Sequence, residues 1–460
     1  MIILKFGGTS VADAQAICRM MSIVEDRLNK EPLIVVSALS KVTDTLYKIC
    51  DYTEHCQAKE ALLLVEHLRE RHKHVADGLI PVENPLHAEA CQKIDQLCNQ
   101  LKKLVEVICG LEELSDRSRA RIIATGEYLS SNLIGCALNA RGIRTHLLDA
   151  RKIILTDHNH LKGEPDLPRI SEIAPQIIRQ AQYLLDEAPA QALITQGFVS
   201  ATESGIPTVL GRGGSDYTAS ILGMAVNAQE IEIWTDVNGV HTADPRKVAD
   251  TRSLPLISFE EAAEMAHFGA KVLHPSTIEP AVLKNIPISV LNSRQPEAPG
   301  TRILRDQDIP EGIKSLSCKE HVQIINIFSS RMINASGFLS RVFDLFSTHH
   351  LPIDLISTSQ ASISVSVPAE EDTDLLIEAL SSFATVFVET DKSQVSLVGK
   401  RMARTPDLYP KLFECLRNEK IYMISQGAGL NNLSLVIDRH RLSPLMNQLH
   451  QTLFAHEHHH

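Results

Sequence analysis

The sequence has few aromatic residues and no excess of basic ones. Aromatic residues make up 4% of its 460 positions, so the hydrophobic cores are expected to be mainly aliphatic. The formal net charge of −11 argues against broad nucleic-acid binding, which requires a basic surface. No run of about 18 apolar residues occurs, so no membrane span is expected. Since the N-terminus also lacks the basic and apolar segments of a signal peptide, we expect a cytoplasmic protein.

Motifs for metals and disulfides are missing as well. The nine cysteines are odd in number and match no zinc or redox spacing, which favours small buried thiols in a reducing compartment. The histidines form no ligand pattern, and we expect His72 and His74 to face water because they lie in a charged stretch. Residues 457–460 read EHHH and are interpreted as the remnant of an affinity tag.

The remaining composition suits a globular protein of several domains. Hydrophobic residues make up 44% and charged residues 22%, and the length predicts roughly two to four domains. Across 1–295, apolar strands alternate with helical patterns, which predicts an α/β fold whose mainly parallel sheet is covered on both faces. The strands are predicted at 33–39, 192–198, 230–237 and 287–293, and the helices near 127–141, 170–187, 216–228 and 259–284.

Three regions depart from this alternation. Residues 54–115 are charged and helical and predict an excursion from the sheet, whereas the proline-rich segment 296–320 is predicted to be a linker. The elements over 322–390 follow the order βαββαβ, and a second copy begins at 393 and lacks the last strand. The missing strand could come from interleaving of the two copies or from a partner.

The first ten residues, MIILKFGGTS, place Lys5, Gly7 and Gly8 at the end of a strand. A helix is predicted over 11–28, because apolar residues recur there on one face. Glycines let the backbone approach a ligand, and a helix N-terminus offers free N–H groups to an anion. The stretch therefore predicts an anion cradle charged by Lys5. The alternative is a tight turn beside a surface lysine.

The segment TVLGRGGSDYTAS (208–220) repeats this pattern with an arginine in the loop. The guanidinium of Arg212 suits a carboxylate or a phosphate. Asp216 follows where a helix begins, so it would either cap the helix or orient a lysine or a metal near phosphates. The segment does not match a Walker A loop, and it is a weak match to a dinucleotide fingerprint.

Three other segments offer candidate polar side chains, one of them, Lys271, on a predicted helix. WTDVNGVHTADPRKV (234–248) is a polar loop after a strand, a place where open α/β sheets bind ligands, and a plain surface loop is the alternative. FGAKVLHP (268–275) contains Lys271, which could equally be a solvated lysine. ATGEYLSSNL (124–133) places Glu127 at a helix start, where it would complement the helix dipole or pair with a substrate ammonium group.

Taken together, five segments resemble those of aspartokinases, members of the amino-acid kinase superfamily, in order and in rough spacing: KFGGTSV, GEYLSS, GRGGSDYTA, WTDVNGVHTADPR and EMAHFGAKVLHP. The repeated tail resembles the paired ACT domains of the single-function, lysine-sensitive members. The resemblance implies an αβα sandwich at 1–295, a linker at 296–320, and two ferredoxin-like α+β ACT domains at 321–391 and 392–456. It also implies ATP- and Mg²⁺-dependent phosphorylation of L-aspartate, the first step toward lysine, diaminopimelate, threonine and methionine.

The resemblance implies roles for individual residues, with Lys5 and Asp216 as the catalytic pair. Glu127 would bind the substrate ammonium group and Arg212 its α-carboxylate. The amino-acid pocket would be completed by Ser37, Thr43, Phe198, Gly213, Gly214 and Ser215. ATP would be held by Lys5, Gly7, Gly8, Thr9, Ser10, Thr235, Asp236, His241, Arg246 and Lys271. No metal ligands are assigned. The sequence departs from the family pattern at His241, where an aromatic is frequent, and at Leu39-Ser40.

L-Lysine is the effector that the resemblance implies, acting as an allosteric inhibitor. Its site would comprise Met332, Ser336, Gly337, Phe338, Leu339, Ile353, Asp354 and Ser359. Relatives usually carry a glutamate where this sequence has Gln360, so one negative charge is missing. Because ACT sheets expose edge strands, we expect a homodimer or a dimer of dimers through residues 320–455.

Two other functions remain open at this point. One is an amino-acid kinase acting on glutamate, acetylglutamate or UMP, against which Glu127, Arg212 and the ACT pair argue. The other is a noncatalytic sensor of amino acids that uses the ACT pair alone, against which Lys5 and Asp216 argue.

Overall fold

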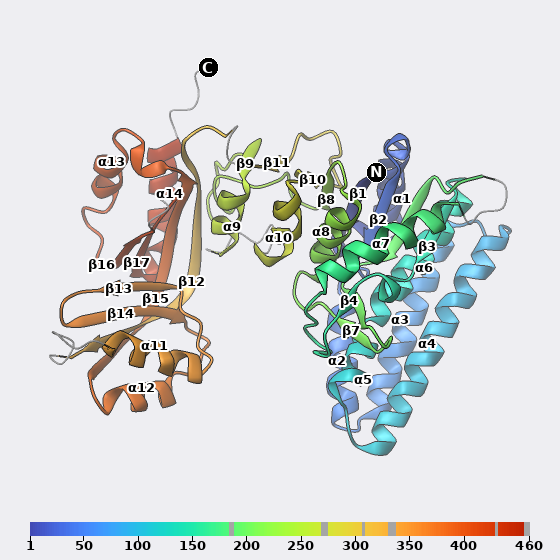
Figure 1. Ribbon diagram of the computed structural model, residues 1–460, viewed down its shortest axis with the longest axis horizontal. Helices are drawn as coiled ribbons and strands as arrows, with labels where there is room; N and C mark the ends of the chain where they lie inside the picture. Colours follow the sequence, from blue (N-terminus) through green and yellow to red (C-terminus); the bar gives the residue numbers. More distant parts are fainter. Residues whose placement is uncertain (184–187, 268–274, 306–308, 330–336, 428–430, 455–460) are drawn as a thin grey trace. The chain divides into compact units, whose positions relative to one another are not determined.

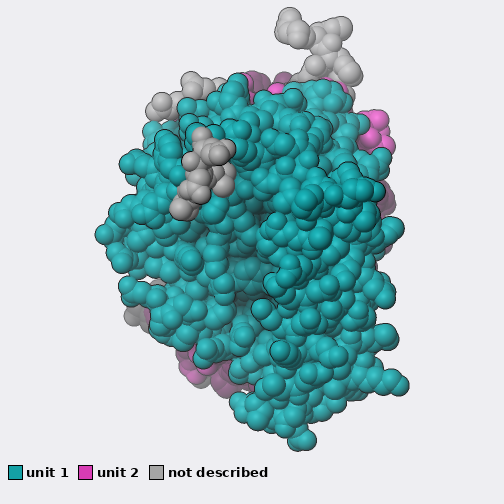
Figure 2. Space-filling view, turned by 90° about the vertical axis from the view of Figure 1, so that its right-hand side faces the viewer, with its two compact units in different colours: residues 1–240, 273–305 teal, residues 241–272, 306–460 magenta. Residues whose placement is uncertain are grey.

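A computed structural model describes residues 1–183, 188–267, 275–305, 309–329, 337–427 and 431–454 of the chain. The chain divides into two compact units, coloured teal and magenta in Figure 2. Unit 1 comprises residues 1–240 and 273–305, and unit 2 comprises residues 241–272 and 306–460.

Unit 1 is built on a mainly parallel sheet with the strand order β3-β5-β2-β1-β8-β10-β11. Neighbouring strands from β3 to β10 are parallel, and β10 and β11 are antiparallel. All residues of β1, β2 and β5 are buried, so both faces of the sheet are covered, which confirms the predicted fold class. The strands are β1 (Ile2–Phe6), β2 (Pro32–Val36), β3 (Thr145–Leu148), β5 (Ala192–Gln196), β8 (Ile231–Thr235), β10 (Ile288–Asn292) and β11 (Thr301–Leu304).

The helices of unit 1 follow the predicted alternation (Figure 1). Beside the large sheet lies a small one in the order β4-β6-β7, formed by β4 (Leu155–Thr156), β6 (Val199–Thr202) and β7 (Pro207–Val209). Outside the helical extension, the helical elements are η1 (Gly8–Val11), α1 (Ala14–Glu25), η2 (Leu28–Lys30), η3 (Ala150–Lys152), α7 (Leu167–Gln182), α8 (Gly214–Val226) and α10 (Pro275–Lys284). Within the described ranges, no helix is both long and apolar enough to cross a membrane.

A helical extension follows β2, as predicted for 54–115. It consists of α2 (Val42–Glu54), α3 (Ala58–Leu79), α4 (Pro85–Leu111), α5 (Asp116–Ile123) and α6 (Thr125–Ala140), and α3 and α4 run side by side (Figure 1). The prediction that His72 faces water is wrong. His72 is fully buried, because it lies on the same face of α3 as Leu68 and Val75, and its burial lowers its pKa to about 4.

Unit 2 contains an antiparallel sheet with the strand order β13-β14-β12-β15-β17-β16. Its strands are β12 (Gly312–Phe328), β13 (Leu355–Thr358), β14 (Ser362–Pro368), β15 (Thr385–Lys400), β16 (Ile421–Gln426) and β17 (Asn432–Asp438). One hydrophobic core lies between the sheet and α11 (Phe338–Thr348) with α12 (Asp374–Ser381). A second lies between the sheet and α13 (Leu408–Cys415) with α14 (Leu442–Phe454). Unit 2 also holds β9 (Leu256–Ser258), α9 (Phe259–His267), η6 (Met402–Arg404) and η7 (Arg439–Arg441).

The strand that the second copy of the repeat lacks comes from the first half of β12. Residues 312–319 pair with the second half of β15, whereas Val322–Phe328 pair with the first half of β15 and with β14. The two copies are therefore interleaved, and no partner chain is needed to complete the second one. The pairing of β12 with β15 shifts register between Lys319 and Ile324, at the junction of the two halves.

The linker predicted at 296–320 is wrong in detail. The segment contains β11, which pairs with β10, and the start of β12 at Gly312. Its three prolines, Pro296, Pro299 and Pro310, all precede strands rather than interrupting them, which explains how a proline-rich segment can hold ordered strands. Residues 241–272, which the sequence places with the first domain, belong to unit 2.

Candidate active site

An open cavity of about 830 Å³ lies in unit 1 where the adjacent strands β5, β2, β1 and β8 end. The carboxyl edge of a parallel sheet is where open α/β folds bind ligands. The cavity brings together most of the residues that the sequence predicts for the amino-acid and phosphate sites. Its lining is Lys5, Gly7, Gly8, Thr9, Ser37, Ala38, Leu39, Ser40, Lys41, Thr43, Asp44, Tyr47, Glu127, Phe198, Gly211, Arg212, Gly213, Gly214, Ser215, Asp216 and Thr235.

Lys5 and Asp216 form an ion pair in this cavity. Lys5 lies near the end of β1 and Asp216 in the first turn of α8, with 2.7 Å between Nζ and Oδ1. The N-cap of α8 is Gly213, which has a φ of +73°, so Asp216 does not cap the helix. The pair fixes a cationic group beside the free backbone N–H groups of a helix start, an arrangement that attracts anions.

The chain segments around this pair can pack as closely as they do only because certain positions are glycine. A Cβ on Gly8 would lie 3.1 Å from the carbonyl oxygen of Ala38, and a Cβ on Gly214 would lie 2.7 Å from the Phe198 ring. Phe198 itself has a φ of +67°, which is rare for a bulky residue. Strained backbone conformations of this kind cluster at functional sites.

Glu127 projects a buried carboxyl group into the cavity from the first turn of α6. Only 3% of the residue is exposed, and Oε1 accepts a hydrogen bond of 3.3 Å from the backbone N–H of Ala38. Oε2 is buried and has no hydrogen-bond partner among the described residues. Burial raises the pKa of Glu127 to about 8. An ammonium group arriving beside Oε2 would supply the missing partner.

Arg212 is a second charged group that faces the cavity. It lies in the loop before α8, and its guanidinium has no ion pair or hydrogen bond to any part of the chain that the structure describes. A guanidinium without a protein partner can bind a carboxylate through two parallel hydrogen bonds. Glu127 and Arg212 therefore offer one carboxyl group and one guanidinium group within one cavity.

Two unit 1 residues predicted to bind ATP, Ser10 and Asp236, are not among the described residues that line this cavity. Ser10 is buried, and its hydroxyl contacts the Trp234 carbonyl at 3.1 Å and the Ser293 hydroxyl at 2.7 Å. Asp236 is exposed next to Thr235. Of the other residues predicted to bind ATP, His241 and Arg246 belong to unit 2, and Lys271 lies outside the described residues.

Within unit 2, these loop residues have local partners. The ring Nδ1 of His241 lies 3.3 Å from Thr251 Oγ1, and burial lowers the pKa of the imidazole. Arg246 is exposed and donates two hydrogen bonds to Asp244, which lowers the pKa of that carboxyl.

The cavity also includes residues that the sequence did not single out. Lys41 precedes α2 in the left-handed region with a φ of +65°, and Asp44 and Tyr47 lie on the first turns of α2. Thr43 and Tyr47 are four residues apart and so share one helix face, which is a signal that sequence inspection could have used. Burial raises the pKa of Tyr47.

The residues predicted to bind the effector lie in unit 2, except that Met332 and Ser336 are outside the described residues. Gly337 is the N-cap of α11 with a φ of +94°, and the ring of Phe338 contacts that of Phe383 edge to face. Leu339 is exposed, Ile353 packs against the core beside α11, and Ser359 contacts the Ser362 hydroxyl.

Asp354 is the charged residue of this set, and it already has a cationic partner. The ammonium group of Lys319, on β12, contacts its Oδ1. The side chain of Asp354 is only 6% exposed, and Oδ2 is buried without a hydrogen-bond partner in the described ranges. One oxygen therefore remains for a further donor.

Comparison with known proteins identifies the family. The profile of the amino acid kinase family matches residues 1–292, and an ACT domain profile matches residues 395–453. Lysine-sensitive aspartokinase 3 of Escherichia coli is 32% identical over 466 residues, which cover 98% of this chain and 99% of that protein. The chain belongs to the aspartokinase family.

Other aspartokinases agree in sequence and structure. The aspartokinase of Chlamydia trachomatis is 33% identical, with 98% of both chains covered. The crystal structure of E. coli aspartokinase III in complex with aspartate and ADP (R-state) matches with a TM-score of 0.83 at 32% identity, covering 99% of this chain and 100% of that one. The complex of the same enzyme with lysine and aspartate (T-state) matches with a TM-score of 0.79 at 31% identity, covering 99% of each chain.

Proposed function

We propose that this chain transfers the γ-phosphoryl group of ATP to the β-carboxylate of L-aspartate, forming 4-phospho-L-aspartate. The observation that carries the proposal is the cavity of unit 1, which contains the Lys5–Asp216 pair together with Glu127 and Arg212. The pair suits a phosphoryl group, and a carboxylate with a guanidinium suits the two charged groups of an α-amino acid. Membership of the aspartokinase family supports the same reaction, and a solved relative binds aspartate and ADP.

The reaction needs no general base in this proposal, because the attacking β-carboxylate is already ionised at neutral pH. Catalysis then rests on positioning and on neutralising charge. Lys5 neutralises charge on the transferring phosphoryl group, and its ion pair with Asp216 holds the ammonium in place. Gly7 and Gly8 leave space for phosphates beside the backbone, as does the glycine start of α8.

The amino-acid subsite uses Glu127 and Arg212 as its two charged anchors. In the free enzyme Glu127 has a pKa of about 8 and is mostly protonated at pH 7. A substrate ammonium beside its carboxylate would favour the ionised form, so binding releases a proton. Arg212 takes the α-carboxylate. The subsite is completed by Ser37, Thr43, Phe198, Gly213, Gly214 and Ser215.

The nucleotide subsite begins at the cavity with Gly7, Gly8, Thr9 and Thr235. We assign Ser10, Asp236, His241, Arg246 and Lys271 to the same subsite on the strength of the family pattern. Mg²⁺ would be held by Asp216 on the protein side, since this ion usually takes one or two carboxylates along with phosphate oxygens and water. When bound, it neutralises phosphate charge.

Regulation by L-lysine is part of the proposal, because the E. coli relative is named lysine-sensitive. The effector ammonium would bind Asp354, either at its unpartnered Oδ2 or by displacing Lys319. The site is completed by Met332, Ser336, Gly337, Phe338, Leu339, Ile353 and Ser359. Lysine inhibits only if it binds a catalytically poor conformation more tightly than the active one.

A homodimer, or a dimer of such dimers, through residues 320–455 is also proposed. The outermost strands of the unit 2 sheet, β13 and β16, carry the exposed side chains of Ile356 and Ile424. Pairing such strands between chains would cover them.

We also propose the boundaries of the domains. The kinase domain comprises residues 1–295, and the two ACT domains comprise residues 321–391 and 392–456. Residues 312–319 are added to the second ACT domain as one of its strands.

We place the reaction in the cytoplasm, because all nine cysteines are free thiols.

Trapping the acyl phosphate with hydroxylamine tests the function. Chain, ATP, Mg²⁺ and aspartate should yield aspartyl hydroxamate, and the Lys5→Ala chain serves as the negative control. Parallel assays of ADP release with glutamate, acetylglutamate and UMP test the other kinases of the superfamily. Hydroxamate from glutamate but none from aspartate would reassign the substrate. A chain that binds lysine and releases no ADP with any substrate would be a sensor.

A further inference from the structure

Unit 1 contains a second pocket that shares no lining residue with the active-site cavity. Its volume is about 110 Å³, and it is lined by residues of α4, α5 and α6 together with Arg151 of η3 and Pro207 of β7. The proposed reaction uses none of these residues.

One side of the pocket carries hydrogen-bond donors that lack partners. The hydroxyl of Tyr128 is buried without a partner among the described residues, and the Arg151 guanidinium lies 5.3 Å from the centroid of the Tyr128 ring. Arg151 donates from Nε and Nη2 to Asp149, at 3.0 and 2.7 Å, while its Nη1 has no partner in the described chain. The Arg121 guanidinium is likewise unpaired within those ranges.

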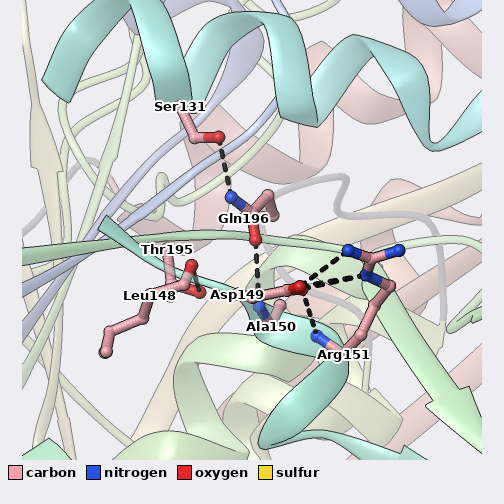
Figure 3. A network of polar contacts seen from close by, with 7 residues as sticks. All are labelled: Ser131, Leu148, Asp149, Ala150, Arg151, Thr195 and Gln196. Atoms are coloured by element: carbon pink, nitrogen blue, oxygen red, sulfur yellow. Dashed lines mark hydrogen bonds and ion pairs between the residues drawn. The ribbon is translucent and has the colours of Figure 1, made fainter. Parts of the chain in front are cut away.

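A network of polar contacts lies next to Arg151 in the chain, as Figure 3 shows. Gln196 of β5 donates to the Ser131 hydroxyl on α6 and accepts from the backbone N–H of Ala150, each at 2.9 Å. The network therefore ties α6, which carries Tyr128, to η3, which carries Arg151. Donors held this firmly are preorganised for a ligand, so little conformational freedom is lost on binding.

The other side of the pocket is apolar and sets the class of ligand. It is formed mainly by Leu97, Leu101 and Leu104 of α4, and none of the described residues that line the pocket is acidic. Guanidinium and phenol groups favour an oxyanion, whereas the leucines favour a hydrocarbon part. A cavity of about 150 Å³ holds benzene, so this smaller pocket suits a ligand of about five heavy atoms.

We propose that this pocket binds a short aliphatic carboxylate, with its carboxylate on Arg121, Arg151 and Tyr128 and its alkyl part on α4. Thr125 and Tyr128 line the pocket on the same turns of α6 that carry Glu127. Because α6 is shared, occupancy alters the amino-acid subsite and raises or lowers the KM for aspartate. The effect on the KM for aspartate rests on the proposed function, whereas the binding site itself does not.

Ligand-observed NMR with propionate tests the site, with propionamide as the neutral isostere. The titration uses the full chain carrying Arg212→Ala, so that the cavity's own carboxylate anchor is removed. Saturation transfer to propionate should be clear, and should fall at least about fivefold in chains that also carry Tyr128→Phe or Arg121→Gln. Arg117→Gln is the matched control, because Arg117 is exposed on α5 and does not line the pocket.

Tyr128→Phe removes no hydrogen bond to any described residue, so its melting temperature should match that of its parent, which separates lost binding from misfolding. Equal binding by propionamide, or binding that neither Tyr128→Phe nor Arg121→Gln reduces, would overturn the site. The absence of any propionate signal in the parent chain would do the same.

The coupling to catalysis is measured in the chain with Arg212 intact. Propionate should change the KM for aspartate, and Tyr128→Phe should abolish that change. A change in KM that persists in Tyr128→Phe would mean that propionate acts in the active-site cavity, and the coupling would be wrong. Failure of the proposed function itself would show separately, as absence of aspartyl hydroxamate without propionate.

Discussion

Two lysine–aspartate pairs, one in each unit, show how differently the same two residue types can be used. Lys5 and Asp216 meet in the open cavity with side-chain exposures of 10% and 19%. In the Lys319–Asp354 pair the lysine is 25% exposed and the aspartate only 6%. In the first pair the buried partner is the cation, whereas in the second it is the anion. The role of each pair follows from which of its two charged groups is more buried. It also follows from which ligand groups the unpartnered atoms of the pair can bind.

The largest expected effect comes from removing the cation of the first pair. Lys5→Ala should lower kcat by at least about 100-fold, because charge on the transferring phosphoryl group loses its neutralising partner. Steady-state kinetics at saturating aspartate and ATP measure it. The same substitution at Lys319 is the matched control and should leave the uninhibited kcat within about threefold. Similar losses of kcat in Lys5→Ala and Lys319→Ala would show that the two pairs do not differ in their role in catalysis.

A smaller effect is expected at the amino-acid anchor of the cavity. Arg212→Ala should raise the KM for aspartate by about 10- to 100-fold, the usual range for a lost charge-assisted bidentate contact, with a lesser change in kcat. Arg302→Ala, at an exposed arginine on β11, is the control and should leave KM unchanged. If kcat fell and KM did not, Arg212 would act in the chemical step instead.

The pH dependence of Glu127 gives the third prediction. With a pKa of about 8 in the free enzyme, Glu127 becomes ionised as pH rises through 8. The kcat/KM for aspartate should therefore rise by up to about tenfold per unit below pH 8 and level off above it. Glu127→Gln should lower kcat/KM and flatten this profile. A flat profile of the unsubstituted enzyme between about pH 7 and 9, one unit either side of the transition, would contradict this role.

Glu127 also links pH to stability. Its folded pKa of about 8 lies above the ordinary value of 4.5, so the folded state holds the extra proton between these values. The free energy of unfolding should therefore fall as pH rises from 4.5 toward 8. Denaturant unfolding of the Glu127→Gln chain should show a weaker decline over this window. An identical decline of the unfolding free energy in both chains would mean that titratable groups other than Glu127 cause it.

The smallest expected effect concerns the second pair. Asp354→Ala should reduce the fraction of activity that lysine removes, since the effector loses its anionic partner. A double-mutant cycle with Lys319→Ala should give a coupling free energy on the order of 1 kcal/mol in unfolding experiments, because the aspartate is buried but the lysine is partly solvated. Additive effects would show that the two side chains do not interact. Unchanged lysine inhibition in Asp354→Ala would move the effector site elsewhere.

The sequence predicted local features well and distant contacts only through the family resemblance. Strands such as 33–39 and the helices of 54–115 were recognisable, because burial on one face leaves a regular apolar spacing. The burial of His72 was missed, since the charges around it on α3 concealed its place on the apolar face. The strands within 296–320 were missed, because prolines just before a strand resemble those of a linker.

Sequence alone determined the alternation of strands and helices in the first part of the chain, the βαββαβ order of the repeat, the glycine turns beside Lys5 and Arg212, and the family. Tertiary structure decided which distant side chains meet. Lys5 reaches Asp216 because α8 packs against β1, and Glu127 acquires its pKa of about 8 only through burial between elements. The two halves of β12 serve different copies of the repeat for the same reason. Local spacing encodes which face of an element is apolar, but which element covers that face depends on the whole chain.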